Sequence, residues 1–258
     1  RSETVIGDSP RSYRVRGVRV IEDCVQYSLS SKLGEHSDFA ITSYRKLLPV
    51  VDGAALFFNA PMDLSSMALK LDQPDEAFVS SRMIGKIMRG ARAKPQSFLP
   101  LFEFSELRLN EKIVPRQISW LSTWMLERLD WDDVIAKRRN NWRSLLGMLE
   151  EADLTDRIQP IFKVLGNDDI PLGLVVSVFA GVRDGLRIFL ANENIFCPVH
   201  WPLEHLREED TLPVERDLAS RVLTLPIDQR MSSDQIERYV KVLASFFNQA
   251  SMAKFLER

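Results

Sequence analysis

Residues 18–59 constrain the fold of this chain more than any other stretch. The segment opens with an apolar run, Val18 to Ile21, which is typical of a buried strand in a parallel sheet. Glu22 and Asp23 follow directly, and Gln26 comes one helical turn later. The two acids therefore fall just past the carboxyl end of a strand, which is where open α/β sheets bind their ligands.

A lysine motif follows about twenty residues after the acids. Ser43 to Lys46 has the pattern Ser-x-x-Lys, and the apolar stretch behind it ends at the small-residue turn Asp52 to Ala54. This set suits a pyridoxal-phosphate (PLP) enzyme, because a lysine can hold the cofactor as a Schiff base, a carboxylate can keep its ring nitrogen protonated, and a hydroxyl can bind its phosphate. Taken singly, an aspartate after a strand is usually a turn or cap residue, and a lysine is usually a solvated charge. The hypothesis therefore depends on the order and spacing of the whole set.

The segment resembles the sugar aminotransferases of the DegT/DnrJ/EryC1/StrS family, which are PLP enzymes of the aspartate-aminotransferase fold (fold type I). In that family a strand ending in "ieDaAqa" precedes a Ser-containing strand, the Schiff-base lysine and a "geGG" turn. The resemblance implies that Asp23 pairs with the ring nitrogen, that Gln26 lies near the ring's phenolic oxygen, and that Lys46 holds the cofactor.

Two positions are matched less fully. Ser43 corresponds to a phosphate-contacting serine in some branches of the family, whereas others place that serine five residues before the lysine, where this chain has Ile41. Gly53 matches the first glycine of the turn, and Ala54 replaces the second. The replacement reduces the steric room of the turn without removing a reacting group.

The second half of the chain extends the resemblance to residue 258. The stretch KRRNNWRSLLGML, from Lys137, resembles the helix that leads out of the family's cofactor domain. The expected fold class is therefore α/β: residues 1–135 are the remainder of a PLP-binding large domain, a three-layer αβα structure with a mostly parallel sheet, and residues 136–258 are a small α+β domain. The tail "HWPL … LTLPID" also matches the family, whose histidine loop lies near the mouth of the active site. His200 is therefore a candidate substrate contact, with a neutral structural histidine as the alternative.

Hydrophobic periodicity and turn residues predict the other elements. Strands are expected over 39–43, 54–58, 158–165, 172–179, 195–199 and 222–225, and helices over 74–92, 115–129, 132–151, 183–193, 214–219 and 236–247, the last capped by Ser232 or Ser233. The tryptophans of the region 115–151 are expected to pack in the core or at a subunit interface.

Composition excludes several classes of function. With a net charge of −2 and no basic run clear of acids, no nucleic-acid surface is expected. No apolar run reaches membrane-spanning length and no signal peptide is visible, so a cytoplasmic protein is expected. Cys24 and Cys197 are expected to be reduced, buried thiols. His36, His200 and His205 are scattered and no cysteines are paired, so no metal site is expected.

In the family, well over a hundred residues precede the aspartate strand, and they supply several strands and the loop whose helix N-terminus receives the cofactor phosphate. Residues 1–17 are polar and basic and supply none of this, and the first residue is Arg1. The chain is therefore expected to be N-terminally truncated relative to the family, and to bind PLP weakly or not at all by itself.

The resemblance implies a homodimeric aminotransferase that moves an amino group from an amino acid, glutamate, to a nucleotide-linked keto-sugar. The alternative is a non-catalytic remnant or partner subunit that keeps the dimer surface. A dehydratase of the same fold is a third possibility, but relatives on that branch have a histidine in place of the lysine, and Lys46 argues against it.

Overall fold

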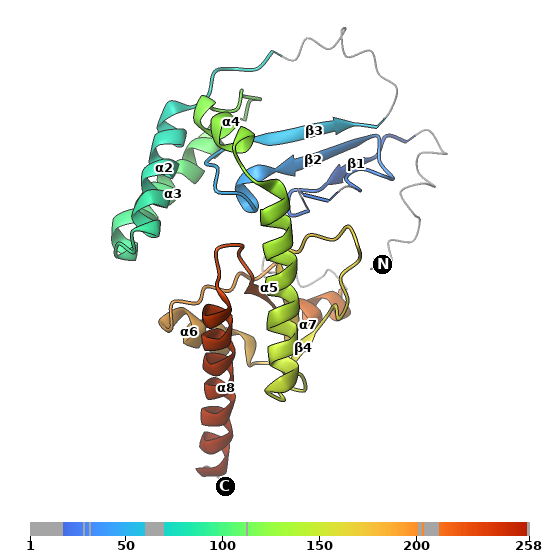
Figure 1. The fold of residues 1–258 in the computed structure, drawn as a ribbon, viewed down its shortest axis with the longest axis vertical. Coiled ribbons are helices and arrows are strands. Elements are labelled where there is room, and N and C mark those ends of the chain that lie inside the picture. The colour runs from blue at the N-terminus through green and yellow to red at the C-terminus, as the bar shows by residue number, and fades with distance from the viewer. Residues whose placement is uncertain are drawn as a thin grey trace. The chain divides into compact units, whose positions relative to one another are not determined.

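The structure is a computed structural model, and it describes residues 18–256 except 28, 31, 60–69, 112, 201–202 and 204–211. The chain divides into two compact units, Arg1–Leu129 and Asp130–Arg258. Figure 1 shows the elements of each unit. The boundary predicted near residue 135 falls inside helix α5 (Trp131–Glu151), which belongs wholly to the second unit.

The first unit contains a three-stranded mixed sheet (Figure 1). Strand β1 (Ile21–Asp23) is parallel to β2 (Phe39–Ser43), and β2 is antiparallel to β3 (Ala54–Phe58). The predicted bounds of β2 and β3 are confirmed. The expectation of a mostly parallel sheet is not met by the described strands. The connection between β2 and β3, residues 44–53, is shorter than the dozen or more residues that a parallel crossover needs.

Strand β1 differs from its prediction in position and in burial. It begins at Ile21 instead of Val18, and Ile21 is 65% exposed. Among the described strands, β1 pairs with β2 alone and lies at the edge of the sheet. The prediction of a buried strand was therefore wrong, because burial depends on neighbours that an apolar run does not itself specify.

The described part of the first unit also contains the α-helices α2, α3 and α4. Helix α2 (Glu76–Gly90) begins as predicted near Pro74, and its N-cap carboxylate, Asp75, accepts a hydrogen bond from Phe78 N at 3.0 Å. Helix α3 (Pro95–Glu111), which contains Pro100 in its interior, was not predicted from the sequence. Helix α4 (Trp120–Glu127) is shorter than the predicted helix, because residues 115–119 are not helical and the backbone of Arg116 forms an isolated β-bridge with that of Asp72.

Helices α2 and α3 form an antiparallel hairpin (Figure 1). Their close approach depends on Gly85, because a Cβ atom there would lie 2.6 Å from Cε1 of Phe102. The Phe102 ring packs edge-on against that of Phe98, with 5.8 Å between ring centroids. We call this pair of helices, residues 76–111, the α2–α3 hairpin.

The second unit packs helices against an antiparallel sheet. The sheet has the order β4 (Ile158–Pro160), β5 (Gly173–Val178), β6 (Val222–Pro226), and the helices are α5, α6 (Arg183–Asn192), α7 (Pro213–Arg221) and α8 (Ser233–Leu256). Side chains from α5, α6, α8 and the sheet form one buried core that includes Leu145, Leu149, Leu174, Leu186, Leu223, Leu225 and Leu243. All the helices predicted in this unit are present.

Two strand predictions in the second unit need correction. Strand β4 ends at Pro160 instead of residue 165. Residues 195–199 form no strand, although Pro198 O accepts a hydrogen bond from Thr224 N at 3.2 Å. A proline has no N–H with which to extend such a ladder, so the segment runs beside β6 without regular pairing.

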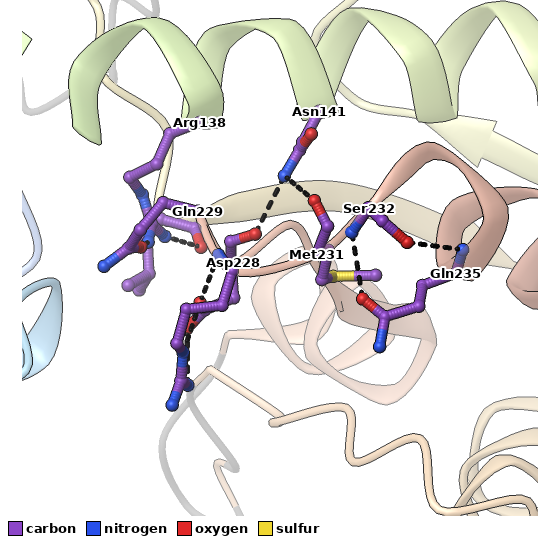
Figure 2. A network of polar contacts seen from close by, with 9 residues as sticks. Arg138, Asn141, Asp228, Gln229, Met231, Ser232 and Gln235 are labelled. Atoms are coloured by element: carbon purple, nitrogen blue, oxygen red, sulfur yellow. Dashed lines mark hydrogen bonds and ion pairs between the residues drawn. The ribbon is translucent and has the colours of Figure 1, made fainter. Parts of the chain in front are cut away.

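The N-cap prediction for α8 is confirmed for Ser232. Ser232 Oγ accepts a hydrogen bond from Gln235 N at 3.4 Å, and Gln235 Oε1 accepts one from Ser232 N at 2.9 Å. This reciprocal pair is a capping box, and it is visible in Figure 2.

Both cysteines are free and buried, as predicted, and they lie in different units. Burial raises the pKa of the Cys197 thiol from 9.0 to about 11, although its contact with the Tyr239 hydroxyl at 3.3 Å and the charge of Arg187 act in the opposite direction. The folded chain therefore holds the thiol proton more tightly than the unfolded chain does.

We expect Cys197 to stay protonated and unreactive in the folded chain at pH 8. A Cys24→Ser variant leaves Cys197 as the sole thiol, and its reaction with a disulfide reagent should be at least about a hundredfold slower in the folded chain than in denaturant. Because unfolding releases this proton between pH 9 and about 11, the thiol lowers the free energy of unfolding as the pH rises through that range. Equal rates in the folded and denatured chains would contradict the burial of Cys197.

Candidate active site

The parallel pairing of β1 and β2 brings the predicted residues to one edge of the sheet. Asp23, the last residue of β1, is in register with Ile41 on β2. Ser43 ends β2 two residues later, or about 7 Å further along the strand. Lys46 is the last residue of the short helix η1 (Tyr44–Lys46), which follows β2 directly. Asp23, Ser43 and Lys46 therefore gather at the carboxyl ends of two parallel strands.

Strand periodicity also places Asp23 and Ser43 on the same face of the sheet. Residues in register share a face, and so do residues two apart in a strand, which relates Asp23 to Ile41 and then to Ser43. Ala40 and Thr42 point to the opposite face, and both are fully buried. The face that carries Asp23 and Ser43 is the more exposed one, since Ile41 and its β3 neighbour Leu56 are both partly exposed.

The Asp23 side chain is exposed and is oriented by a local hydrogen bond. Its Oδ1 accepts a bond from Val25 N at 3.0 Å, so one carboxylate oxygen stabilises the turn that follows β1. Gln26 is half-buried in that turn, which Tyr27 N closes by donating to Cys24 O at 2.8 Å. Asp23 therefore does act as a turn residue, and its hydrogen bond with Val25 N fixes the direction in which the carboxylate points.

Lys46 lies at the surface of a loop that is otherwise anchored in the core. The loop residues 44–53 are held by backbone hydrogen bonds from Leu48 N to Tyr44 O at 2.8 Å and from Tyr44 N to Gly53 O at 3.1 Å. The apolar residues that follow the lysine are buried, namely Leu47, Leu48, Val50 and Val51. The Lys46 side chain is exposed, and no ion pair joins it to another residue in the described part of the chain.

Asp52 connects this loop to the start of α4. Its Oδ1 accepts a hydrogen bond from Ser119 Oγ at 2.7 Å, and its Oδ2 accepts one from Ser119 N at 2.8 Å. Ser119 is also the N-cap of α4, where its Oγ accepts from Ser122 N at 3.2 Å. A carboxylate with two short bonds in a half-buried position holds the loop in one conformation.

Two further contacts connect the loop to the α2–α3 hairpin. Arg45 donates to Glu106 Oε1 on α3 at 3.0 Å, and the same oxygen accepts from Arg82 on α2 at 2.7 Å. Burial would raise the pKa of the Glu106 carboxyl, but the two guanidinium groups outweigh it and lower this pKa below its ordinary value. Lys86 Nζ donates to Val50 O, so the residues on both sides of Lys46 are attached to the hairpin.

Gly53 is required by the geometry of the turn. Its φ is +102°, and a Cβ atom there would lie 2.6 Å from Cδ1 of Ile118. Ala54 begins β3 opposite Ser43, where the backbone is extended and a methyl group fits. The replacement of the second glycine by alanine therefore leaves the loop conformation intact.

His200 lies in the second unit. Its Nδ1 is 3.1 Å from Oγ1 of Thr224, which is buried on β6. This bond supports the structural alternative for His200. Within the described residues, no group of three or more His, Cys, Asp or Glu side chains gathers to hold a metal ion. None of the helices in the described ranges is long and apolar enough to cross a membrane.

Several residues that position the site were not anticipated from the sequence. These are Lys86 on α2, Glu106 on α3 and Ser119 at the start of α4. Each contacts the lysine loop from a distant part of the chain. The capping signal at Ser119 was present in the sequence, but the predicted helix start at residue 115 obscured it.

Solved structures with a fold similar to that of this chain include sugar aminotransferases. The chain matches a DegT DnrJ EryC1 StrS aminotransferase from Brucella abortus with a TM-score of 0.56 and 19% identity, over 91% of this chain and 59% of the other. It matches the sugar aminotransferase CalS13 from Micromonospora echinospora with a TM-score of 0.51 and 15% identity, over 88% of this chain and 58% of the other. A third match is NtdA from Bacillus subtilis with bound cofactor PMP, with a TM-score of 0.56 and 14% identity, over 91% of this chain and 51% of the other.

These matches show that the chain has the fold of these aminotransferases, as the sequence resemblance predicted. The chain spans between 51% and 59% of the length of the three solved structures. No protein-family model and no curated protein sequence matches it.

Proposed function

We propose that this chain carries the lysine and aspartate of a PLP-dependent aminotransferase of the DegT/DnrJ/EryC1/StrS type. The observation that carries the proposal is the parallel pairing of β1 and β2, which puts Asp23, Ser43 and Lys46 at one edge and Asp23 and Ser43 on one face of the sheet. The resemblance in sequence and the likeness in fold point to the same chemistry, since one of the matching structures is described with bound cofactor PMP.

The residues at this edge fit the cofactor. An exposed lysine amine without an ion pair in the described part of the chain can attack the aldehyde carbon of PLP. The carboxylate of Asp23 can keep a ring nitrogen protonated, because it is exposed and its direction is set by Val25 N. Ser43 offers a hydroxyl for the phosphate, and Gln26 an amide for the phenolic oxygen.

When bound, PLP acts as an electron sink for the carbon that carries the amino group. Lys46 Nζ would hold the cofactor and, once released, would serve as the base that takes the proton from the substrate carbon. Asp23 would accept a hydrogen bond from the protonated ring nitrogen. Asp52, Glu106 and Lys86 fix the loop that positions the lysine.

The proposed substrates are glutamate as amino donor and a nucleotide-linked keto-sugar as acceptor. The sugar is supported by the likeness to the sugar aminotransferase CalS13. His200 is kept as a candidate substrate contact, although its bond to Thr224 favours a structural role. We further propose a cytoplasmic homodimer, because α2, α3 and α4 of the first unit expose large apolar side chains. The non-catalytic alternative is not favoured, since the lysine and the aspartate are both accessible.

The experiment that tests the proposal is trapping of the cofactor on the lysine. The full chain is mixed with PLP and reduced with borohydride, and peptide mapping should then locate the pyridoxyl group on Lys46. A Lys46→Arg variant should lose this label, while Lys94→Arg, which removes another exposed lysine of the same unit, should keep it. A label on another lysine, or equal labelling of both variants, would overturn the assignment.

A further inference from the structure

Lys46 lies in the less firmly held part of its loop. Residues 47–53 are fixed by four buried apolar side chains and by the two hydrogen bonds that Asp52 accepts. Tyr44–Lys46 form the single 3₁₀ turn η1, and all three residues are half-buried or exposed. Isolated 3₁₀ turns have poor hydrogen-bond geometry. The position of Lys46 therefore depends on the side-chain contacts of η1 as well as on its backbone.

Two arginines from different elements meet at one oxygen of Glu106. Arg45 of η1 lies 3.0 Å from Oε1 of Glu106, and Arg82 of α2 lies 2.7 Å from the same atom. Like charges at such a separation repel each other. Burial lowers the pKa of Arg82 most, the charge of Arg45 lowers it further, and Glu106 acts in the opposite direction. The carboxylate therefore holds together two cations that would otherwise separate.

Arg82 is held firmly in the α2–α3 hairpin. Its side chain is 13% exposed, and its guanidinium donates to Oγ of the buried Ser105 at 3.0 Å. The guanidinium carbon also lies 5.7 Å from the ring centroid of Phe78 and 5.4 Å from that of Phe102, and aromatic faces attract a cation. Arg82 therefore stays in place when its neighbours change, and any separation of the two arginines moves Arg45.

We infer that this cluster is a charge-operated latch on η1, in which Glu106 holds Arg45 closed and repulsion by Arg82 opens it when the charge of Glu106 is lost. Opening would displace Lys46, because Arg45 and Lys46 are neighbours in η1. A simple anchor would make Glu106 and Arg82 act in the same direction, whereas the latch makes them act in opposite directions. The effect on the cofactor rests on the proposed function, but the movement of η1 can be measured without cofactor.

The test is hydrogen exchange of the Leu47 and Leu48 amides in the full chain without cofactor. Both amides donate to Tyr44 O, at 3.2 and 2.8 Å, so they lose protection when η1 opens. Glu106→Gln keeps the size of the side chain and removes its charge, and it should lower this protection at least about fivefold. Glu103→Gln removes an exposed charge one turn earlier on α3, and as the matched control it should change the protection less than about twofold.

A second substitution distinguishes the latch from an anchor. Arg82→Met keeps an apolar chain between the two aromatic rings and removes the repelling charge. Added to Glu106→Gln, it should restore the protection to within about twofold of the wild type. Arg45→Gln removes the other partner and leaves the core of the hairpin untouched, and in that background Glu106→Gln should have no further effect. Circular dichroism confirms that each variant is folded.

Borohydride labelling of Lys46 in the same variants measures the effect on the cofactor. With PLP below saturation, the rate of labelling should fall in Glu106→Gln and recover when Arg82→Met is added. Unchanged protection in Glu106→Gln, or a loss that Arg82→Met deepens, would overturn the latch. If the protection changed as expected but the wild-type lysine took no label, the latch would stand and the proposed function would fail.

Discussion

Replacement of Asp23 by asparagine is expected to reduce transamination at least about a hundredfold while leaving the fold intact. Asparagine can still accept the hydrogen bond from Val25 N through its side-chain oxygen, so the turn after β1 is retained. A neutral amide cannot stabilise a positive charge on the ring nitrogen of the cofactor, and the developing negative charge on the substrate then has no acceptor. The change therefore acts on the reaction step and leaves the structure in place.

The measurement compares the rate of the half-reaction with glutamate in the cofactor-loaded protein. Covalent attachment of PLP to Lys46 serves as the second readout, since Asp23→Asn should retain it. Glu35→Gln, which removes an exposed charge from the loop between β1 and β2, is the control and should change the rate less than about threefold. If Asp23→Asn kept the wild-type rate, Asp23 would be a turn residue alone.

Local patterns were sufficient for most of the elements. The apolar residues of β2 and β3 and the periodicity of α2 and α5 are contained within each segment, and the predicted bounds of these elements agree with the structure to within two residues. Helix α3 was not predicted: Pro100 is unfavourable within a helix, whereas packing of Phe102 against Gly85 of α2 stabilises the helix through a tertiary contact.

In the candidate site, too, the residues that are close in sequence were predicted, whereas those that come from distant parts of the chain were not. Asp23, Ser43 and Lys46 lie in one short stretch, and their order along two parallel strands places them together. The groups that hold the lysine loop, Glu106 and Ser119, depend on tertiary contacts with helices that come later in the chain. No spacing rule relates them to Lys46, so they could be found only from the structure.

Arg138 is a buried arginine whose contacts could not be predicted from the helical periodicity of the sequence. It lies on α5 of the second unit and is 3% exposed. Its guanidinium donates to Pro171 O at 2.9 Å, to Leu172 O at 2.7 Å and to Gln229 Oε1 at 2.6 Å. Figure 2 shows Arg138 beside Asn141, which donates to Asp228 O at 2.8 Å. Together these two residues attach α5 to the turn that precedes α8.

The electrostatic environment of Arg138 is unusual for a buried arginine. Burial lowers its pKa to about 10, with the attraction of Asp228 and the repulsion of Arg230 as smaller effects. No carboxylate of the described residues forms an ion pair with it, because Asp228 is paired with Arg230 at 2.7 Å. The interaction therefore depends on directional hydrogen bonds to neutral oxygens, which the planar guanidinium can make at three points.

Replacement of Arg138 by methionine is therefore expected to lower the free energy of unfolding of the second unit by about 3 kcal/mol. The apolar chain fills similar space, but it leaves two partly buried backbone carbonyls and the Gln229 amide oxygen without their donor, at about 1–3 kcal/mol for each unsatisfied group. Removal of the buried charge offsets part of this cost. Arg138→Lys should recover only part of the loss, because an ammonium group cannot reach all three acceptors from one point.

Urea unfolding followed by tryptophan fluorescence measures the effect, since Trp142 is buried on the same helix. Arg143→Met is the control. Arg143 is exposed on α5, and among the described residues its side chain bonds Asn140 alone, at 3.5 Å, so its loss should change the free energy of unfolding by less than about 0.5 kcal/mol. Equal effects of Arg138→Met and Arg143→Met would show that the three bonds of Arg138 contribute nothing net. A larger effect at Arg138, partly restored by lysine, would establish that this side chain contributes to the attachment of α5 to the 228–232 turn.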